Sequence, residues 1–353
     1  MRIPRDRLQR QIEAILVAWG MSEAHAAITA ARLTDADIRG IDSHGVTLMP
    51  LYQELRAQHQ INFRPDIRVV RDNPVTALID ADHALGHVPS TQAIDLAIEK
   101  AQRNGLAAVA VRSSNHYGAA GVYALRAADA GLIGLSFTSV WHGTTVPTFG
   151  ADGMFGTNPI AFVAPGKSHR VFYLDMATST VAVGKLKLAQ IHGRPLAPGW
   201  ALDANGAVTT DAAHALEDVR LTPLGGTRTM SSHKGYGLAA MVEVLCSMVP
   251  GAWYWATRAA RRPGEHCWNI GHFFLAMDPD QFREAGEFED DLDDMIDALH
   301  ATRRADPDQP VLVPGDPERI AMADREAHGI PVPDNLLAQV RALAADAGAA
   351  WML

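Results

Sequence analysis

The feature that most constrains the fold is a regular alternation of strand-like and helix-like stretches in the first half of the chain. The run Ala107–Arg112 is continuously apolar up to its last residue, as expected of a buried strand. Helical patterns over Thr91–Asn104 and Ala119–Ala130 lie on either side of it, and each ends at a glycine. Strand-like stretches at Val75–Asp80 and Ile133–Thr138 extend the alternation, which predicts an α/β core.

The rest of the chain divides into further helices and strands, with loop-rich sequence after Val140 and irregular sequence over residues 194–232. Helices are predicted at Leu8–Trp19, Ser22–Ile38, Val46–Ala57, Val181–Ile191, Tyr236–Met248, Asp280–Ala285, Asp290–Arg303 and Asn335–Ala345, and strands at Ile67–Val70, Val171–Asp175 and His272–Ala276. We expect residues 1–60 and 317–353 to form a discontinuous helical domain. Residues 61–316 are then an α/β domain that binds cofactor and substrate.

Composition and charge argue against several kinds of partner. The 353 residues carry a formal net charge of −9, whereas a nucleic-acid-binding face needs an excess of Lys and Arg. The densest basic run, Arg258–Arg262, is short and predicted to be a solvated loop. Two cysteines, Cys246 and Cys267, suit a reducing compartment, and no run is apolar enough for a signal peptide or membrane span. We expect a cytoplasmic protein that binds neither nucleic acid nor membrane.

Several common cofactor and metal motifs are absent from the sequence. No strand-to-helix junction carries the G-x-G-x-x-G fingerprint, which argues against an ordinary Rossmann dinucleotide site. Neither a Walker A pattern nor H-E-x-x-H occurs, and the 15 histidines are dispersed without metal-ligand pairs. We therefore expect no metal site.

Polar residues gather instead in glycine-rich turns between the predicted elements. The turn Arg39–Val46 places His44 between Ser43 and a glycine, and Ser113–Gly118 places His116 directly after the buried strand. A histidine exposed on such a turn can exchange a proton near pH 7. In both turns the serine could instead simply cap the next helix.

Four more polar turns follow, and each alone is weak evidence for a ligand site. They are Phe155–Pro159, Asp175–Ser179, Ser232–Gly237 and Val313–Asp316, the last of which has the local pattern of a plain turn. Asp175–Ser179 joins a strand to a helix, so its amides and hydroxyls can surround an anion. Lys234, followed by Gly235 and Gly237 at the start of a helix, can meet phosphate through charge and close backbone approach.

Taken in order, these turns and their flanks resemble the type-2 malate/L-lactate dehydrogenase family. The resembling words are RGIDSHGV, SNHYGAAGVYA, FGTNPIAFVAP, LDMATS, HKGYGLAAMVEVL, GHFFLAMDP and VPGDPE, spanning about Arg39 to Glu318. The family includes ureidoglycolate, sulfolactate and diketogulonate enzymes and cyclic-imine carboxylate reductases. The resemblance implies a non-Rossmann α/β fold of the sulfolactate/malate dehydrogenase type, with NAD or NADP as cofactor, and a homodimer with its active site near the subunit interface.

The resemblance also implies roles for individual residues. His44 and His116 become the acid–base candidates, with Ser43 bonding His44 to fix its tautomer. Substrate contacts are implied for Tyr52 and Asn158, with Asn158 at the nicotinamide end. Cofactor contact is implied for Ser139, Asp175, Met176, Ala177, Lys234, Gly235, Pro314, Gly315 and Asp316.

Two positions depart from the family pattern. Several relatives carry arginine four residues after the first histidine, where it pairs with the substrate carboxylate, but this chain has Leu48. Either Arg39 or Lys234 anchors the carboxylate, or the substrate differs. Imine reductases of the family carry an aspartate where this chain has Gly184-Lys185, which weakens the imine-reductase interpretation.

The resulting hypothesis is hydride transfer between NAD(P) and a small 2-hydroxy or 2-oxo acid of the malate, lactate or sulfolactate type, with a histidine exchanging the hydroxyl proton. A cyclic-imine carboxylate reductase or ureidoglycolate-type dehydrogenase is the alternative within the family. A cofactor-binding homologue with little turnover is a further alternative, because of Leu48. A hydrolase using Ser43 or Ser114 is disfavoured, because no G-x-S-x-G elbow occurs.

Overall fold

The structure is a computed structural model that describes residues 1–168, 171–257 and 267–353. The basic run Arg258–Arg262 lies outside the described residues. Among those described, no helix is long and apolar enough to cross a membrane.

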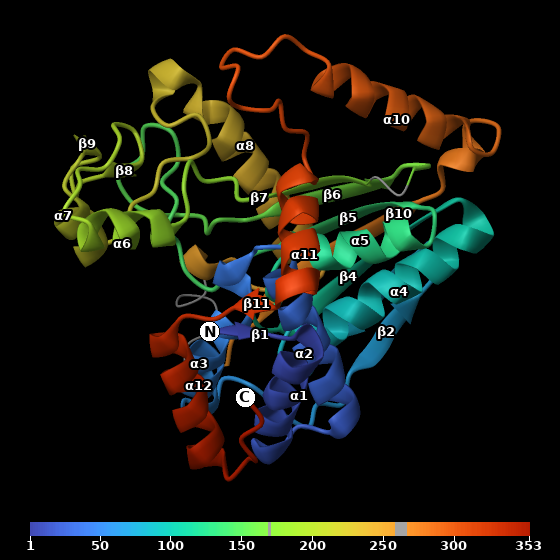
Figure 1. Cartoon of the computed structure of the whole chain (residues 1–353), viewed down its shortest axis with the longest axis horizontal. Coiled ribbons are helices and arrows are strands. Elements are labelled where there is room, and N and C mark those ends of the chain that lie inside the picture. Colours follow the sequence, from blue (N-terminus) through green and yellow to red (C-terminus); the bar gives the residue numbers. More distant parts are fainter. Residues whose placement is uncertain (169–170, 258–266) are drawn as a thin grey trace.

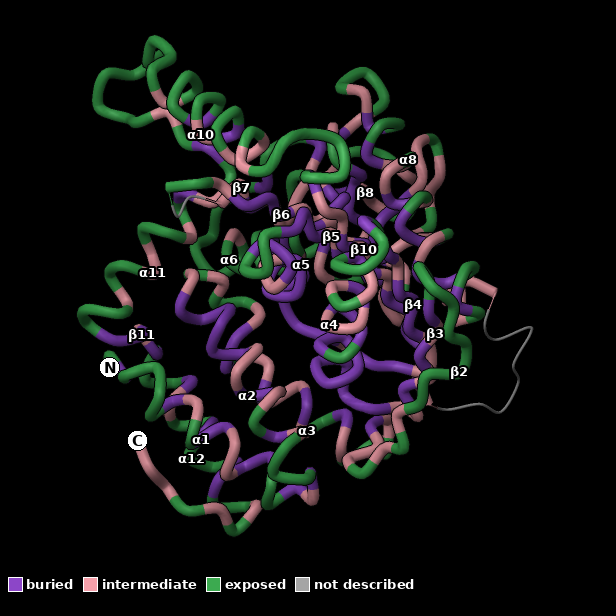
Figure 2. The backbone as a smooth tube through the Cα atoms, turned by 90° about the vertical axis from the view of Figure 1, so that its right-hand side faces the viewer, coloured by how far each residue is buried: buried purple, intermediate pink, exposed green. Residues whose placement is uncertain are grey.

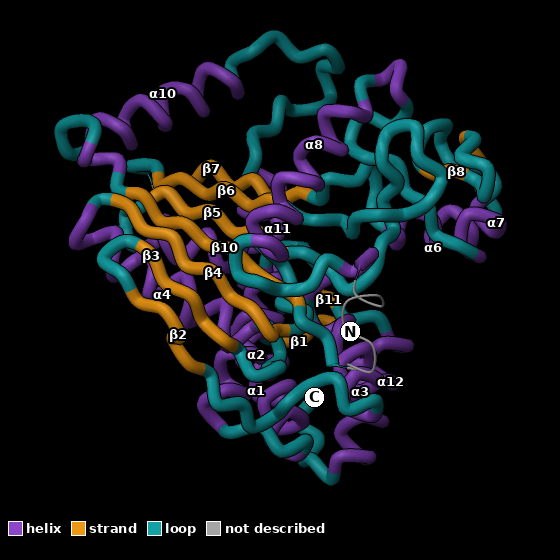
Figure 3. Tube along the Cα trace, turned by 180° about the vertical axis from the view of Figure 1, so that it is seen from behind, coloured by secondary structure: helices purple, strands orange, loops and turns teal. Residues whose placement is uncertain are grey.

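A seven-stranded mixed sheet forms the centre of the molecule (Figure 3). Its order is β2 (Arg68–Asp72), β3 (Thr76–Asp80), β4 (Leu106–Ser114), β10 (Ile270–Met277), β5 (Ile133–Thr138), β6 (Ile160–Pro165) and β7 (Val171–Met176). Only β3 and β4 pair in parallel, and β10, from late in the chain, separates β4 from β5. The α/β prediction is confirmed, and so is the absence of a doubly wound parallel sheet.

The two faces of the sheet are covered by different helices. Successive residues of β10 point to opposite faces, so that Phe274 packs with α4 (His87–Asn104) and α5 (Gly121–Asp129), while Phe273 packs towards α8 (Ser232–Glu243). Farther along the second face, α10 (Glu287–His300) buries Leu292 and Ile296 against β5 and β6. Figure 2 shows the rest of α10 to be largely exposed.

A second hydrophobic cluster joins the two ends of the chain. It contains residues of α1 (Arg5–Ala18), α2 (Glu23–Ile38), α3 (Met49–Ala57) and α12 (Asp334–Ala347). The two-stranded sheet of β1 (Arg2–Ile3) and β11 (Ile330–Pro331) fastens the N-terminus beside the C-terminal segment, and both termini lie at the same end of the molecule (Figure 1). This cluster agrees with the expected grouping of the ends, whereas the division into domains stays a prediction.

A small lobe projects from the body where irregular sequence was expected (Figure 1). It has its own apolar cluster and contains α6 (Val183–Ile191), β8 (Ala201–Leu202), β9 (Val208–Thr209) and α7 (Ala212–Glu217). The two strands have only two residues each, which explains why no alternating pattern marked them.

Four sequence predictions of secondary structure need correction. The helix expected at Asp280–Ala285 is wrong, because only a 3₁₀ turn forms at Pro279–Gln281 and Gly286 (φ 88°) precedes α10. Strand β6 was missed because Asn158-Pro159 and Pro165 suggested loop. The turn at Val313–Asp316 leads directly into an unpredicted helix, α11 (Asp316–His328). The helix predicted at Tyr236–Met248 begins earlier, at Ser232, and its last turn, Val244–Met248, is π-helical.

The cluster that joins the chain ends predicts a sharp contrast between neighbouring residues of α1. Leu16 is fully buried in it, whereas Val17 is 40% exposed. We expect Leu16→Ala to lower the free energy of unfolding by about 2–5 kcal/mol, through lost burial and a residual cavity. Val17→Ala should change it by less than about 0.5 kcal/mol. Urea unfolding followed by circular dichroism measures both, and equal effects would contradict the assigned burial.

Candidate active site

Antiparallel pairing brings the predicted site residues to one edge of the sheet. Across the sheet, Ser114 at the end of β4 pairs with Ile270, and Thr138 at the end of β5 pairs with His272. Farther on, Ile160 at the start of β6 lies opposite Met176 at the end of β7. Because these positions form one row, the residues just beyond them share an edge; they are His116, Ser139, Asn158 and Ala177.

His44 reaches this edge from the helical unit. It lies in a 3₁₀ turn, Asp42–His44, between α2 and α3. Its ring stacks on that of His116 with centroids 5.9 Å apart and planes 19° from parallel. The indole of Trp141 packs edge-on against His116 at 5.9 Å. Two turns that are 72 residues apart in the sequence therefore form one histidine pair beside an aromatic wall.

The Nδ1 atom of each histidine in the pair lies within hydrogen-bond distance of a side-chain hydroxyl group. Ser43 Oγ lies 2.7 Å from His44 Nδ1, and Tyr52 Oη lies 3.0 Å from His116 Nδ1. The backbone N–H of Gly118 also donates to His116 Nδ1, at 3.4 Å. Since a backbone N–H can only donate, Nδ1 of His116 accepts, and the proton of the neutral ring lies on Nε2. In this tautomer the Nε2–H of His116 can donate to a substrate oxygen, whereas Nε2 has no lone pair with which to accept a proton.

Burial sets the charge of the pair. Desolvation lowers the pKa of His44 below its usual 6.5, and burial lowers that of His116 well below 6.5, with the nearby His44 adding a smaller effect of the same sign. Both rings are therefore neutral at pH 7 in the free protein, which is the form that accepts a proton.

Asp37, which the sequence analysis missed, holds the His44 turn in place. It is 2% exposed, and its Oδ2 accepts from the N–H of Val46 at 2.9 Å. Burial raises the pKa of Asp37 to about 7, with its Val46 bond opposing. A Cβ on Gly45 would lie 1.7 Å from Asp37 Oδ1, so glycine is required there. The sequence signal was an aspartate among apolar helix positions eight residues before a glycine.

His87 was also missed. It is 1% exposed, packs edge-on against Tyr52 with ring centroids 5.6 Å apart, and neither of its ring nitrogens has a hydrogen-bond partner. Burial lowers the pKa of His87 to about 3, so that it stays neutral. Its place at the start of α4, against Tyr52 and Gly118, makes it part of the support behind His116.

The expected cofactor residues lie in three groups, two of them at this edge and the third farther along β7. Asp175, the residue before the last of β7, accepts from the N–H of Gly121 at 2.8 Å, and burial raises its pKa to about 6. Gly235 packs on the backbone of Leu224, whose N–H bonds Thr178 at 2.8 Å, so the start of α8 with the exposed Lys234 adjoins the segment after β7. Pro314, Gly315 and Asp316 line a cavity with Val171 and Tyr173 of β7.

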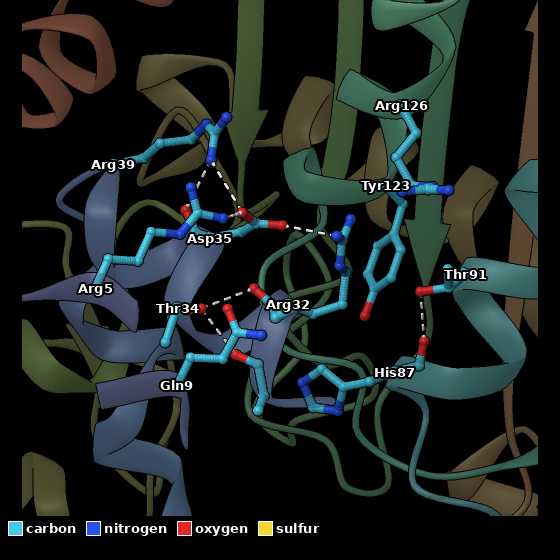
Figure 4. A network of polar contacts seen from close by, with 12 residues as sticks. Arg5, Gln9, Arg32, Thr34, Asp35, Arg39, His87, Thr91, Tyr123 and Arg126 are labelled. Carbon is cyan, nitrogen blue, oxygen red and sulfur yellow. Dashed lines mark hydrogen bonds and ion pairs between the residues drawn. The ribbon is translucent and has the colours of Figure 1, made fainter. Parts of the chain in front are cut away.

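Arg39 lies with this last group. It lines the cavity that contains Pro314–Asp316, and its guanidinium bonds the backbone carbonyl of Asp35 at 3.1 Å and lies 3.7 Å from its carboxylate (Figure 4). No contact joins it to either histidine within the described part of the chain. Leu48, at the position where relatives have arginine, is half-buried. Across residues 1–168, 171–257 and 267–353, no cluster of three potential metal ligands occurs.

Asn158 is held in a fixed orientation under the site. Its backbone is left-handed (φ 33°), and its Nδ2 donates to the carbonyl of Ala239 at 3.0 Å and to Glu243 at 2.9 Å. Both partners are acceptors, so the side-chain amide can have only this orientation. Burial raises the pKa of Glu243. The buried pair fastens α8 to the loop before β6.

Comparison with known proteins gives the class of this α/β fold, which lacks a Rossmann site and has a histidine pair at the sheet edge. The malate/L-lactate dehydrogenase family model matches residues 3–341. The chain is 37% identical to the malate dehydrogenase of Pyrococcus horikoshii, covering 99% of this chain and 96% of that protein. It is 35% identical to the L-sulfolactate dehydrogenase of Methanocaldococcus jannaschii, covering 99% and 98%.

Solved structures give the same result. The malate dehydrogenase of Entamoeba histolytica superposes with a TM-score of 0.94 at 28% identity, covering 99% of both chains. This chain belongs to the malate/L-lactate dehydrogenase family. The resemblance inferred from its sequence is confirmed, and with it the assignment to a family of hydroxy-acid dehydrogenases.

The close approach of Gly45 to Asp37 predicts a specific defect. Gly45→Ala forces Asp37 or the turn to move, displacing His44, and a shift of about 1 Å in a reacting group can cost about 10²-fold in rate. We expect kcat to fall by about that factor. Gly184→Ala is the matched control, because its Cβ would meet nothing within 4 Å. Turnover in Gly45→Ala equal to that of the control would contradict the prediction.

Proposed function

We propose that the chain is an NAD(P)-dependent dehydrogenase that interconverts a small 2-hydroxy acid and the corresponding 2-oxo acid, acting as a cytoplasmic homodimer. The observation that carries the proposal is the stacked His44–His116 pair at the sheet edge, where Ser139, Asn158 and Ala177 also gather. The names of the relatives, malate and L-sulfolactate dehydrogenases, support a dicarboxylic or otherwise anionic hydroxy acid.

The residues around the edge fit a nicotinamide cofactor. The Gly315 backbone approaches Val171 and Tyr173 so closely that a Cβ would lie 2.8 Å from the Val171 carbonyl. Because glycine has no side chain, a narrow space remains there for one end of the cofactor. The buried hydroxyl of Tyr173, which lies beside Gly121 and Asp175, has no partner. Ser139, Asp175–Ala177, Gly235 and Pro314–Asp316 would hold the cofactor, while Lys234 would meet the substrate carboxylate. When bound, it supplies the hydride acceptor or donor.

The histidine pair performs the proton half of the reaction. Oxidation of a hydroxy acid releases its hydroxyl proton as the hydride leaves C2, and Nε2 of His44 would take that proton, since it is free to accept when Nδ1–H of the same ring donates to Ser43 Oγ. In the reverse direction that Nε2–H returns the proton to the carbonyl oxygen. Tyr52 and Gly118 keep Nδ1 of His116 occupied, so this ring would turn its Nε2–H to the substrate and donate to the same oxygen.

The carboxylate of the substrate needs a cation or N–H donors. Leu48 cannot supply one, and Arg39 is occupied at the separate cavity. We propose Lys234, exposed at the start of α8, as the remaining anchor among the two that the sequence suggested. The long side chain of Lys234 can extend to the carboxylate of a substrate bound beside the histidines.

A substrate panel tests the function. NADH and NADPH oxidation would be measured against oxaloacetate, pyruvate, sulfopyruvate, 2,3-diketogulonate and a cyclic imine carboxylate, with ureidoglycolate and NAD⁺ in the reverse direction. We expect turnover with at least one 2-oxo acid. Turnover with only the cyclic imine would support the reductase alternative. Cofactor binding without turnover on any substrate would indicate a binding homologue and contradict the proposal.

Removal of either imidazole should lower kcat. We expect His116→Ala and His44→Ala to lose about 10²–10⁴-fold, the span usual for general acid–base groups. His214→Ala, on the exposed α7 of the lobe, is the matched control and should keep full activity. Near-wild-type turnover in both site variants would remove the histidines from the mechanism.

The lowered histidine pKa values predict the pH profile. Oxidation needs the neutral base, so kcat/KM for the hydroxy acid should be level at pH 7 and fall only below a pKa that is under 6.5. Reduction needs the protonated form, so its kcat/KM should fall as pH rises through the same pKa. Steady-state rates over the accessible pH range measure both limbs. An oxidation limb with a pKa above 6.5 would disagree with a buried, neutral base.

A further inference from the structure

A cavity of about 190 Å³ lies away from the histidine pair, between α5, β7 and the start of α11. Its lining includes Asp129 of α5, Tyr173 of β7, and Gly315 and Glu318 at the start of α11. Tyr173 is 3% exposed, and its hydroxyl has no hydrogen-bond partner. This hydroxyl lies beside Gly121 and Asp175 and is not open to the cavity, and a buried hydroxyl without a partner costs free energy.

The position of the cavity matches the second half of an extended dinucleotide. Met176, at the sheet edge near the histidines, and Tyr173, at the cavity, are three residues apart on β7. At about 3.3 Å per strand residue they are separated by roughly 10 Å. Asp175 and the start of α5 at Gly121 lie between them. A cofactor whose nicotinamide lies by His116 would therefore extend along β7 to this cavity with its adenosine.

The charges around the cavity are weighted towards carboxylates. Three carboxylates line it, from Asp129, Asp316 and Glu318, against two guanidinium groups, from Arg39 and Arg319. Arg319 is bonded to Asp316 at 3.0 Å. Arg39 contacts Asp35, which it shares with Arg5 and Arg32, so Arg39 keeps part of its positive charge (Figure 4).

Asp316 is fully engaged within the protein. It accepts from the N–H of Val313 at 2.9 Å and bonds His300 at 2.6 Å as well as Arg319. These bonds lower its pKa to about 2 despite burial. The carboxylates left to meet a ligand are therefore those of Asp129 and Glu318.

The start of α11 offers little to a phosphate group. Helix N-termini bind anions through free backbone N–H groups, but here the N–H of Asp316 bonds Val313 and that of Arg319 bonds Gly315. Pro317 has no N–H. Asp316 itself already places a negative charge on this helix end. Only the N–H of Glu318 remains in the first turn.

We propose that this cavity receives the adenosine half of the cofactor, and that Asp129 and Glu318 make the chain prefer NAD(H) to NADP(H). A carboxylate accepts a hydrogen bond from a ribose 2′-hydroxyl and repels a 2′-phosphate. The inference rests on the proposed function and adds to it the choice of cofactor and the residues that decide it.

Equilibrium binding tests the preference without turnover. Titration with NADH and NADPH, followed by nicotinamide fluorescence, should give at least about tenfold tighter binding of NADH, as expected for a phosphate held near unpaired carboxylates. In competition against NADH, 5′-AMP should displace it and 2′,5′-ADP should do so more weakly. The pair of nucleotides differs only in the 2′-phosphate, so the comparison isolates that group.

Charge-neutral variants locate the effect. Asp129→Asn and Glu318→Gln should each strengthen NADPH binding relative to NADH, and the double variant should do so most. Glu326→Gln is the matched control, because it removes the same charge from an exposed position two turns farther along α11. Thermal unfolding should show all variants folded, so that a changed ratio reports binding alone.

Several outcomes would overturn the inference. Equal or tighter binding of NADPH by the unmodified protein contradicts it, and so does a binding ratio that the cavity variants shift no more than Glu326→Gln. If oxo-acid reduction is intact in either case, the proposed function stands and only this inference fails. Binding of neither dinucleotide would contradict both.

Discussion

The insertion of β10 between β4 and β5 is the constraint on which the rest of the structure depends. Because β10 runs antiparallel to both neighbours, the ends of β4 and β5 come to the same edge of the sheet. The continuing antiparallel pairs bring the start of β6 and the end of β7 to that edge as well. A parallel sheet would also gather its strand ends, but it would need a crossover helix between each pair. In this sheet the antiparallel pairs need no crossover helix between neighbouring strands, so one face of the sheet is open to α8. The start of α8 carries Lys234.

The second constraint is burial at the edge. His44 and His116 lie in turns, yet packing of the helical unit against the sheet desolvates both rings and keeps them neutral. Hydrogen bonds then fix which nitrogen faces outward, since Gly118 and Tyr52 hold Nδ1 of His116. The buried supports, Asp37 and His87, carry unfavourable desolvation of their own. Such costs are typical of functional sites, where local stability is given up for fixed geometry.

Much of the architecture could be predicted because local patterns dominated it. The apolar run of β4, the glycine-ended helices α4 and α5, and the motif words that identify the family all depend on neighbours close in sequence. Errors arose where tertiary contacts overrode local signals. Strand β6 forms between two prolines because β5 and β7 hydrogen-bond it on both sides. A short 3₁₀ turn capped by Asp278 forms in place of the helix predicted at Asp280–Ala285.

The sequence by itself determined the α/β class, the family and the two histidine turns, because each depends on short sequence motifs of chemically distinctive residues. Only the tertiary structure decided that His44 stacks on His116, that Arg39 lies with Pro314–Asp316 rather than with the histidines, and that Asp37 and His87 support the site. These facts depend on contacts between segments far apart in the chain. Burial and hydrogen bonding across such contacts set charge and tautomer, and no local pattern encodes them.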